Sequence, residues 1–201
     1  MNNGSDQWGV LLLAAGFSRR FGGIKLQARF ADGDTIFTKT LNNIIQATDN
    51  IIVVGRKDLL DQNVYQNFPA SPGQTLVLCD DAEAGMGQSL ACGIQQVPAA
   101  WNSVLICLAD MPFVQAQTIT ALMQQSREDR IVIPVFEHQR GQPVSFGKKF
   151  FAELAQSHGD TGGRHVIRDH SDLVMEFPTT DNGVLLDIDT PETLQALSTR
   201  R

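Results

Sequence analysis

Short apolar runs alternate with amphipathic stretches along most of the chain. Residues 8–14 are almost uninterruptedly apolar, which predicts a strand buried on both faces of a sheet. Between residues 35 and 48, apolar side chains recur with helical spacing on one face and predict a helix. Strands and helices of this kind follow one another along the chain, which is typical of a mostly parallel sheet covered by helices.

The remaining elements follow from the same pattern. Further strands are predicted at residues 50–54, 75–79, 104–109, 131–135, 143–146 and 172–177. Helices are predicted at 57–67 and 88–96, and another by the apolar face formed by Ala116, Ile119, Leu122 and Met123. The last helix has the clearest start, because Thr190 suits the N-cap, Pro191 the first helical position and Glu192 the positive end of the helix.

Length and charge narrow the class of protein. We expect a single α/β domain covering 1–201, because 201 residues with 42% hydrophobic side chains suffice for one core. The net charge of −6 argues against nucleic acid as the main partner, since proteins that bind DNA or RNA usually carry a basic face. The apolar runs are too short for a membrane span or a signal peptide, so we expect no membrane partner and a cytoplasmic location.

Cysteines and histidines suggest neither a disulfide framework nor a zinc site. Cys79, Cys92 and Cys107 are odd in number and form no CxxC pair, and apolar surroundings predict inert thiols at Cys79 and Cys107. The histidines lack the spacing of metal ligands, although His138 lies close in sequence to Arg140. The four histidines are His138, His158, His165 and His170.

Chemistry-bearing residues gather where predicted strands end. Glycines and cations occupy residues 16–25 after the first strand, a polar loop covers 80–87 after the third, and Asp110 follows the fourth. Open parallel sheets bind ligands beyond the carboxyl ends of their strands. The sequence therefore predicts one site at this edge.

The loop at residues 13–25 has the composition of an anion site. Small residues allow the backbone to approach a ligand, its amides can cradle phosphate oxygens, and Arg20 and Lys25 supply positive charge. It contains neither GxGxxG nor GxxxxGK[ST], which excludes the dinucleotide fingerprint and the Walker loop. The alternative is an ordinary glycine-rich turn with solvated arginines.

Two further segments allow both a functional and a structural interpretation. Asp110 ends an apolar strand before Pro112, and its carboxylate suits Mg²⁺ beside phosphates; alternatively it caps the helix that starts near Gln115. Gly85 and Gly87 lead into a helix whose free amides favour an anion, or simply mark a helix start.

The opening loop resembles the signature LAAGxSxRxGxxK of the MobA-like NTP transferases. The matching positions are Leu13, Ala14, Ala15, Gly16, Ser18, Arg20, Gly22 and Lys25. The resemblance implies a three-layer, Rossmann-like nucleotidyltransferase fold, with Arg20 and Lys25 on the phosphates and Asp110 as the magnesium ligand. It implies nucleotide binding, within a first half of about residues 8–112, by Leu13, Ala14, Ala15, Gly16, Ser18, Arg20, Lys25, Asp80, Gly85, Gly87 and Ser89.

Three later segments resemble those of molybdenum cofactor cytidylyltransferases. They are RGxPV at 140–144, GDxGxR at 159–164 and DIDTP at 187–191. The resemblance implies an acceptor-binding second half, about 113–197, with Arg140, Gly141, Pro143, Asp160 and Arg164 at the acceptor. Asp189 is expected to give the metal a second carboxylate, although Asp187 is an alternative and Asp189 can instead cap the last helix.

The implied reaction transfers CMP from CTP to the terminal phosphate of molybdopterin, the molybdenum cofactor, with Mg²⁺ as cofactor and pyrophosphate as product. Members that use GTP typically read LAGG at the loop, whereas Ala15 matches the LAAG of members that use CTP. Asp110-Met111-Pro112 departs from the Asp-Gln-Pro of many cytidylyl members, which bears on the acceptor. Alternatives are a GTP-using or sugar- or alditol-phosphate nucleotidyltransferase, or a chaperone that carries cofactor to a molybdenum hydroxylase.

Overall fold

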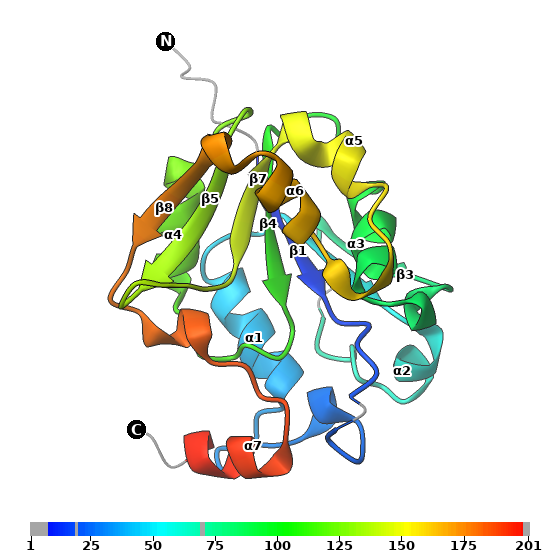
Figure 1. The fold of residues 1–201 in the computed structure, drawn as a ribbon. Coiled ribbons are helices and arrows are strands. Elements are labelled where there is room, and N and C mark those ends of the chain that lie inside the picture. The colour runs from blue at the N-terminus through cyan, green and yellow to red at the C-terminus, as the bar shows by residue number, and fades with distance from the viewer. Residues whose placement is uncertain (1–7, 19, 69–70, 199–201) are drawn as a thin grey trace.

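A computed structural model of the protein describes residues 8–18, 20–68 and 71–198, so the expected domain of 1–201 extends past the described residues at both ends. Eight strands form one sheet in the order β3-β2-β1-β4-β7-β5-β6, with β8 beside β5 (Figure 1). The strands are β1 (Trp8–Leu13), β2 (Ile51–Gly55), β3 (Gln74–Leu78), β4 (Ser103–Leu108), β5 (Ile131–Phe136), β6 (Gln139–Arg140), β7 (Val144–Gly147) and β8 (Val174–Pro178). The helices are α1 (Ile36–Ile45), α2 (Lys57–Asp61), α3 (Met86–Ile94), α4 (Ala116–Gln125), α5 (Phe151–Leu154), α6 (Arg164–Asp169) and α7 (Pro191–Ser198).

The predicted mostly parallel sheet is confirmed. β3, β2, β1 and β4 run parallel to one another, and β8 runs parallel to β5. Only β7, which lies between β4 and β5, and the short β6 are antiparallel to the strands beside them. The carboxyl ends of β1 and β4 therefore meet at the same edge, as a ligand site in such a sheet requires.

Helices cover both faces of the sheet and complete three layers (Figure 1). The alternation of strand side chains divides the core between the two faces. Val10 and Leu12 of β1 pack into one cluster with apolar residues of α1 and α4. Leu11 and Leu13 pack on the other face with residues of α3, α5 and α6. The continuous apolar run of β1 is thus explained by burial on both sides.

Local signals set the ends of several helices. Thr35 caps α1 by accepting a hydrogen bond from the amide of Thr38. Thr190 caps α7 in the same way through the amide of Thr193, as predicted. The helix predicted at 57–67 ends at Asp61, because Asn63 adopts a left-handed φ of 59°. Among the described residues, no helix combines the length and the apolar character needed to cross a bilayer.

Candidate active site

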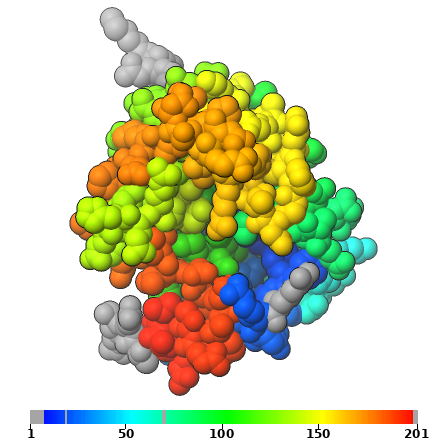
Figure 2. Space-filling model, viewed as in Figure 1, coloured from blue at the N-terminus to red at the C-terminus, as the bar shows by residue number. Residues whose placement is uncertain are grey.

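A cavity of about 380 Å³ opens at the carboxyl ends of β1 and β4. Figure 2 shows the surface hollowed where the loop after β1, the segment near residue 160 and the C-terminal segment meet. The residues of the expected site that line the cavity are Leu13, Ala14, Ala15, Gly16, Ser18, Arg20, Lys25, Gly85, Ser89, Asp110, Asp160 and Asp189. The structure therefore brings together all three strand ends that the sequence singled out.

The loop after β1 turns sharply along one wall of the cavity. Ser18 has a φ of 48°, which a residue with a side chain rarely adopts, and its carbonyl accepts a hydrogen bond from the amide of Phe21. Tyr65 stabilises the start of the loop, because its hydroxyl donates a hydrogen bond to the carbonyl of Ala14 over 2.9 Å. Burial raises the pKa of Tyr65 to about 12, so the phenol remains a donor at neutral pH.

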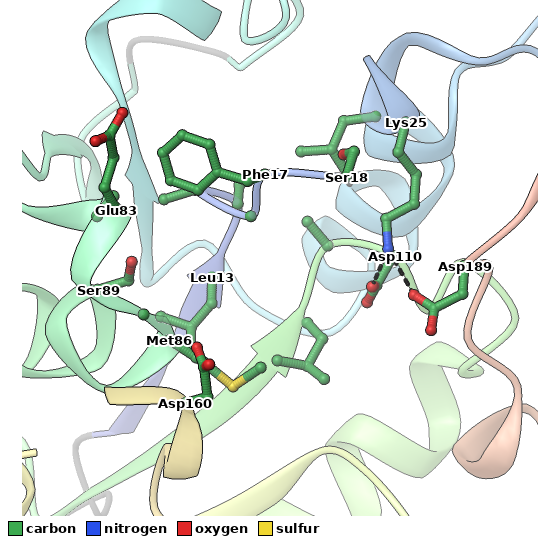
Figure 3. A pocket seen from close by; sticks show the side chains of 18 of the residues that line it. Leu13, Phe17, Ser18, Lys25, Glu83, Met86, Ser89, Asp110, Asp160 and Asp189 are labelled. Atoms are coloured by element: carbon green, nitrogen blue, oxygen red, sulfur yellow. Dashed lines mark hydrogen bonds and ion pairs between the residues drawn. The ribbon is translucent and has the colours of Figure 1, made fainter. Parts of the chain in front are cut away.

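Phe17 forms part of the same wall, and the guanidinium group of Arg56 lies against its ring. The guanidinium carbon of Arg56, which follows β2, lies 3.7 Å from the centre of the Phe17 ring. Glu83 projects from the opposite side of this end of the cavity (Figure 3). The sequence pattern did not single out Phe17 or Glu83, because both are unspecified positions within segments that were otherwise recognised.

Charged side chains gather at the other end of the cavity. The Nζ of Lys25 lies 2.6 Å from Oδ2 of Asp110 and 3.1 Å from Oδ1 of Asp189 (Figure 3). The other oxygen of Asp189, Oδ2, lies 2.7 Å from the guanidinium of Arg20. Residues from three distant parts of the sequence therefore form one group of two cations and two carboxylates, in which Lys25 is largely buried and Arg20 is 75% exposed.

Lys25 is charged in this group. Its side chain is only 11% exposed, and this burial lowers the pKa. The charges and hydrogen bonds of Asp110 and Asp189 outweigh the burial, so the pKa of Lys25 lies above its ordinary value. The ammonium group is thus fully available to pair with anions at neutral pH.

The carboxylates suit a divalent cation. Oδ1 of Asp110 is buried and has no hydrogen-bond partner among the described residues, which leaves a hard oxygen ligand without a donor. Asp189 and Asp110 both contact the ammonium group of Lys25, which lies between them. Among the described residues, neither this cluster nor any other brings together three or more His, Cys, Asp or Glu side chains that could hold a metal ion. One or two carboxylates completed by substrate phosphates is the usual manner of binding Mg²⁺.

A backbone contact brings the C-terminal segment to this cluster. The amide of Ile188 donates to the carbonyl of Asp110 over 2.9 Å, which positions the next residue, Asp189, beside Lys25. Asp187 is exposed, so of the two carboxylates considered it is Asp189 that contacts the cluster. The alternative of Asp189 as the helix cap is wrong, since Thr190 caps α7.

The alternative role of Asp110 as a cap of the following helix is also wrong. The amide of Gln115, at the start of α4, donates to Asp181, which is 66 residues away in sequence. Asp181 is buried and also accepts hydrogen bonds from the hydroxyl of Thr118 and the amide of Gly183. Asp110 is therefore free of this structural task.

Glycines before α3 allow a second segment to reach the cavity. Gly85 has a φ of 116°, and a Cβ on it would lie 2.5 Å from the backbone of Gly159. A Cβ on Gly87 would lie 2.6 Å from the backbone of His158. Gly85 lines the first cavity. Gly87 lines neither cavity, but its lack of a side chain allows α3 to pack closely against the segment at 158–160, and this packing brings Asp160 to the edge of both cavities.

A second, smaller cavity of about 100 Å³ adjoins the first. Both are lined by Leu13, Met86, Leu108 and Asp160, which form their common wall. The floor of the second cavity is apolar and includes Leu90, Ile106, Val144, Phe146 and Ile167. Arg164 lines it together with Gln142, a polar residue that the sequence pattern did not single out.

Several expected site residues lie outside both cavity linings. Arg140 is exposed on β6 and its Nε lies 2.8 Å from a carboxylate oxygen of Glu176. Gly141 packs against Val184, and Pro143 is buried. Asp80 is exposed and does not line the first cavity. The structure therefore does not bring these four positions to the Lys25 cluster.

The cysteines and the histidine near Arg140 are also remote from the cluster. All three cysteines are free. Burial raises the pKa of Cys107, and it raises that of Cys92 to about 11, so these thiols are poor nucleophiles at neutral pH. His138 lies in the exposed turn between β5 and β6.

A glycine-bearing loop with two cations, facing two carboxylates at the edge of a parallel sheet, is consistent with a protein that binds phosphate esters together with a divalent cation. Comparison with known sequences gives the family. Residues 10–174 match the MobA-like NTP transferase domain, and the chain belongs to this family of nucleotidyltransferases.

Named relatives and solved structures agree with this assignment. The chain is 30% identical over 191 residues to the purine catabolism protein PucB of Bacillus subtilis, covering 90% of this chain and 91% of the relative. It is 22% identical over 152 residues to a probable molybdenum cofactor guanylyltransferase of Methanosarcina mazei, covering 74% and 67%. Rv0371c of Mycobacterium tuberculosis matches in structure with a TM-score of 0.82 at 27% identity, covering 96% and 97%. Its manganese complex matches with a TM-score of 0.79 at 25% identity, covering 97% and 100%.

Proposed function

We propose that the protein transfers CMP from CTP to the terminal phosphate of molybdopterin, the molybdenum cofactor, and releases pyrophosphate. The observation that carries the proposal is the pair of cavities with a common wall, one of them ending at the cluster of Lys25, Asp110 and Asp189. Two substrates bound side by side would present their phosphates to each other. Two of the later segments that resemble cytidylyltransferases reach these cavities: GDxGxR supplies Asp160 and Arg164, and DIDTP supplies Asp189.

The proposed chemistry balances without a strong base. A terminal phosphate oxygen of the acceptor attacks the α-phosphorus of CTP and forms a new phosphoanhydride bond. The bond between the α-phosphorus and its bridging oxygen breaks, and the electron pair leaves with pyrophosphate. A phosphate monoester is already anionic near neutral pH, so catalysis depends on alignment and on neutralisation of charge.

Charged residues of the loop would supply that neutralisation. Lys25 and Arg20 are placed to pair with the phosphates of the nucleotide and with the departing pyrophosphate. Asp110 and Asp189 would hold Mg²⁺, which supplies positive charge to the triphosphate when bound. The manganese complex of Rv0371c supports a divalent cation in this fold.

The choice of CTP rests on the loop. Ala15 is buried and lines the cavity, at the position where the resemblance gives GTP-using members a glycine. We propose that its methyl group narrows the site for the nucleotide and so favours the smaller pyrimidine. GTP is the alternative nucleotide, and it is supported by the names of the relatives described as guanylyltransferases. Calorimetric titration with CTP and with GTP in Mg²⁺ separates the two, and a clear preference for GTP would overturn the proposed base.

The second cavity is proposed to take the flat ring system of the acceptor. Apolar side chains form its floor, and Gln142 and Arg164 offer hydrogen bonds at its edge, which suits a heterocycle with polar atoms around an apolar face. Its place beside the common wall would direct the acceptor's phosphate toward Asp110.

Replacing Gln142 with leucine is expected to raise the KM for molybdopterin by about tenfold, because a substrate polar group loses its partner. The KM for CTP should stay unchanged, since Gln142 does not line the nucleotide cavity. R140Q provides the comparison, because Arg140 is exposed and paired with Glu176. A rise in KM for R140Q but not for Q142L, measured by pyrophosphate release, would contradict this placement of the acceptor.

Pyrophosphate release also separates the remaining alternatives. A chaperone would bind the cofactor without producing pyrophosphate, and a sugar- or alditol-phosphate transferase would release it only with those acceptors. Location in the cytoplasm and transient delivery of the product to a molybdenum hydroxylase are part of the same proposal.

A further inference from the structure

The ammonium group of Lys25 lies between the two carboxylates that are proposed to hold the cation. It is 2.6 Å from Asp110 and 3.1 Å from Asp189, and its side chain is 11% exposed (Figure 3). Arg20, in contrast, pairs with Asp189 alone among the described carboxylates, and its side chain is 75% exposed. Lys25 is therefore the residue of the cluster that joins the two carboxylates in this structure.

We propose that Lys25 keeps the cation site closed until the phosphates of a nucleotide draw its ammonium group away, so that the protein accepts the cation together with the nucleotide. The inference rests on the proposed role of Asp110 and Asp189 as ligands. It adds that Lys25 has two successive sets of partners, first the carboxylates and then the phosphates.

The charges in the cluster support this order. Lys25, Arg20, Asp110 and Asp189 carry two positive and two negative charges, so their charges balance within the cluster. A divalent cation entering alone would compete with the ammonium group for Oδ2 of Asp110 and be repelled by its charge. A nucleoside triphosphate supplies the anions that both Lys25 and the cation require. Cation and nucleotide should therefore bind in mutual dependence.

Space for the second position of Lys25 exists on the same wall. Lys25 starts the short helical turn Lys25–Gln27 and lines the cavity beside the phosphate loop, as does Ser18. A lysine side chain has four flexible methylene groups and three donors that rotate freely, so it can exchange carboxylates for phosphates without moving the backbone. The second oxygen of Asp110 is buried and has no hydrogen-bond partner among the described residues, so it would gain a partner when Lys25 moves away and a cation enters.

The test measures binding of Mn²⁺ alone to the full chain by calorimetry and by the paramagnetic signal of free Mn²⁺. K25M should bind Mn²⁺ at least about tenfold more tightly than the wild type, because the competing charge is gone. K39M is the matched control, since it removes the same charge from an ion pair with Asp32 that lies outside the cavity lining. Equal Mn²⁺ affinities for K25M and K39M would overturn the inference.

Two further variants define the site and guard against a folding defect. K25M/D110N should lose the gain in affinity, and a gain that persists would overturn the inference because the cation would then bind elsewhere. K25Q retains a hydrogen-bond donor without the charge and should also bind Mn²⁺ more tightly, so it replaces K25M if that variant does not fold. No nucleotide or molybdopterin is present, so the result is independent of which substrates the enzyme uses.

Discussion

Replacing Asp110 with asparagine is expected to lower kcat by about a thousandfold, the scale seen when one group that stabilises transition-state charge is lost. The change keeps the size of the side chain but removes the charge that pairs with Lys25 and that is proposed to bind the cation. Steady-state pyrophosphate release measures the effect, and thermal unfolding shows whether the fold is kept. We expect the fold to be kept, because Asp110 does not cap α4.

D129N is the matched control for this prediction. Asp129 is exposed between α4 and β5, and the variant makes the same chemical change outside the cavity linings. Its kcat should equal that of the wild type. A D110N enzyme that turns over like D129N would show that the carboxylate is not part of the reaction.

Replacing Asp181 with alanine is expected to lower the free energy of unfolding by about 3 kcal/mol, because buried donors would lose their acceptor and a helix would lose its cap. Oδ2 of Asp181 accepts from the amide of Gln115 at 2.9 Å and the hydroxyl of Thr118 at 2.7 Å. Oδ1 accepts from the amide of Gly183 at 2.9 Å. The bonds from Gln115 and Thr118 join α4 to the segment that leads to Asp189, and the bond from Gly183 stabilises the turn within that segment. Urea unfolding followed by circular dichroism measures the loss.

D129A is the control for D181A, because both variants lose a carboxylate but only D181A loses buried hydrogen bonds. The difference in their free energies of unfolding therefore measures the contribution of the buried bonds. D129A should unfold at the wild-type urea concentration, since Asp129 is exposed. At temperatures where D181A is folded, its kcat should be close to that of the wild type, because Asp181 lines neither cavity. A D181A protein as stable as D129A would contradict the structural role assigned to these bonds.

These two aspartates show where prediction from the sequence succeeds and where it stops. Asp110 follows an apolar strand, and the edge of a parallel sheet is a ligand site whatever the remaining details. The alternative role of Asp110 as a helix cap rests only on its closeness in sequence to Gln115. The actual cap comes from Asp181, which only the folded chain brings to Gln115. Local spacing contains no signal for such a contact.

The longer helices and every strand except the two-residue β6 were predicted, because burial imposes a clear period on them. β1 was recognised from its apolar run, and α7 from Thr190 and Pro191. The short helices α5 and α6, four and six residues long, were missed because one turn or two do not establish a period. Hydrogen-bonded turns and tertiary packing decide these segments instead.

The candidate site was predicted best where its residues are close in sequence. The loop at 13–25 and Asp110 lie at the cavity as expected. Arg140 was expected at the acceptor from its motif, yet it is exposed on β6 beside Glu176 while its neighbour Gln142 lines the second cavity. A motif specifies which residues are adjacent along the chain, but the direction of each side chain depends on strand pairing.

The proposal of a cytidylyl transfer is tested most directly by the products of one reaction. The protein is incubated with Mg²⁺, molybdopterin and either CTP or GTP, and pyrophosphate and the dinucleotide product are quantified. The account predicts equal amounts of pyrophosphate and of the cytosine dinucleotide form of the cofactor with CTP, and little product with GTP. Preferential formation of the guanine product, or binding of the cofactor with no pyrophosphate from either nucleotide, would contradict it.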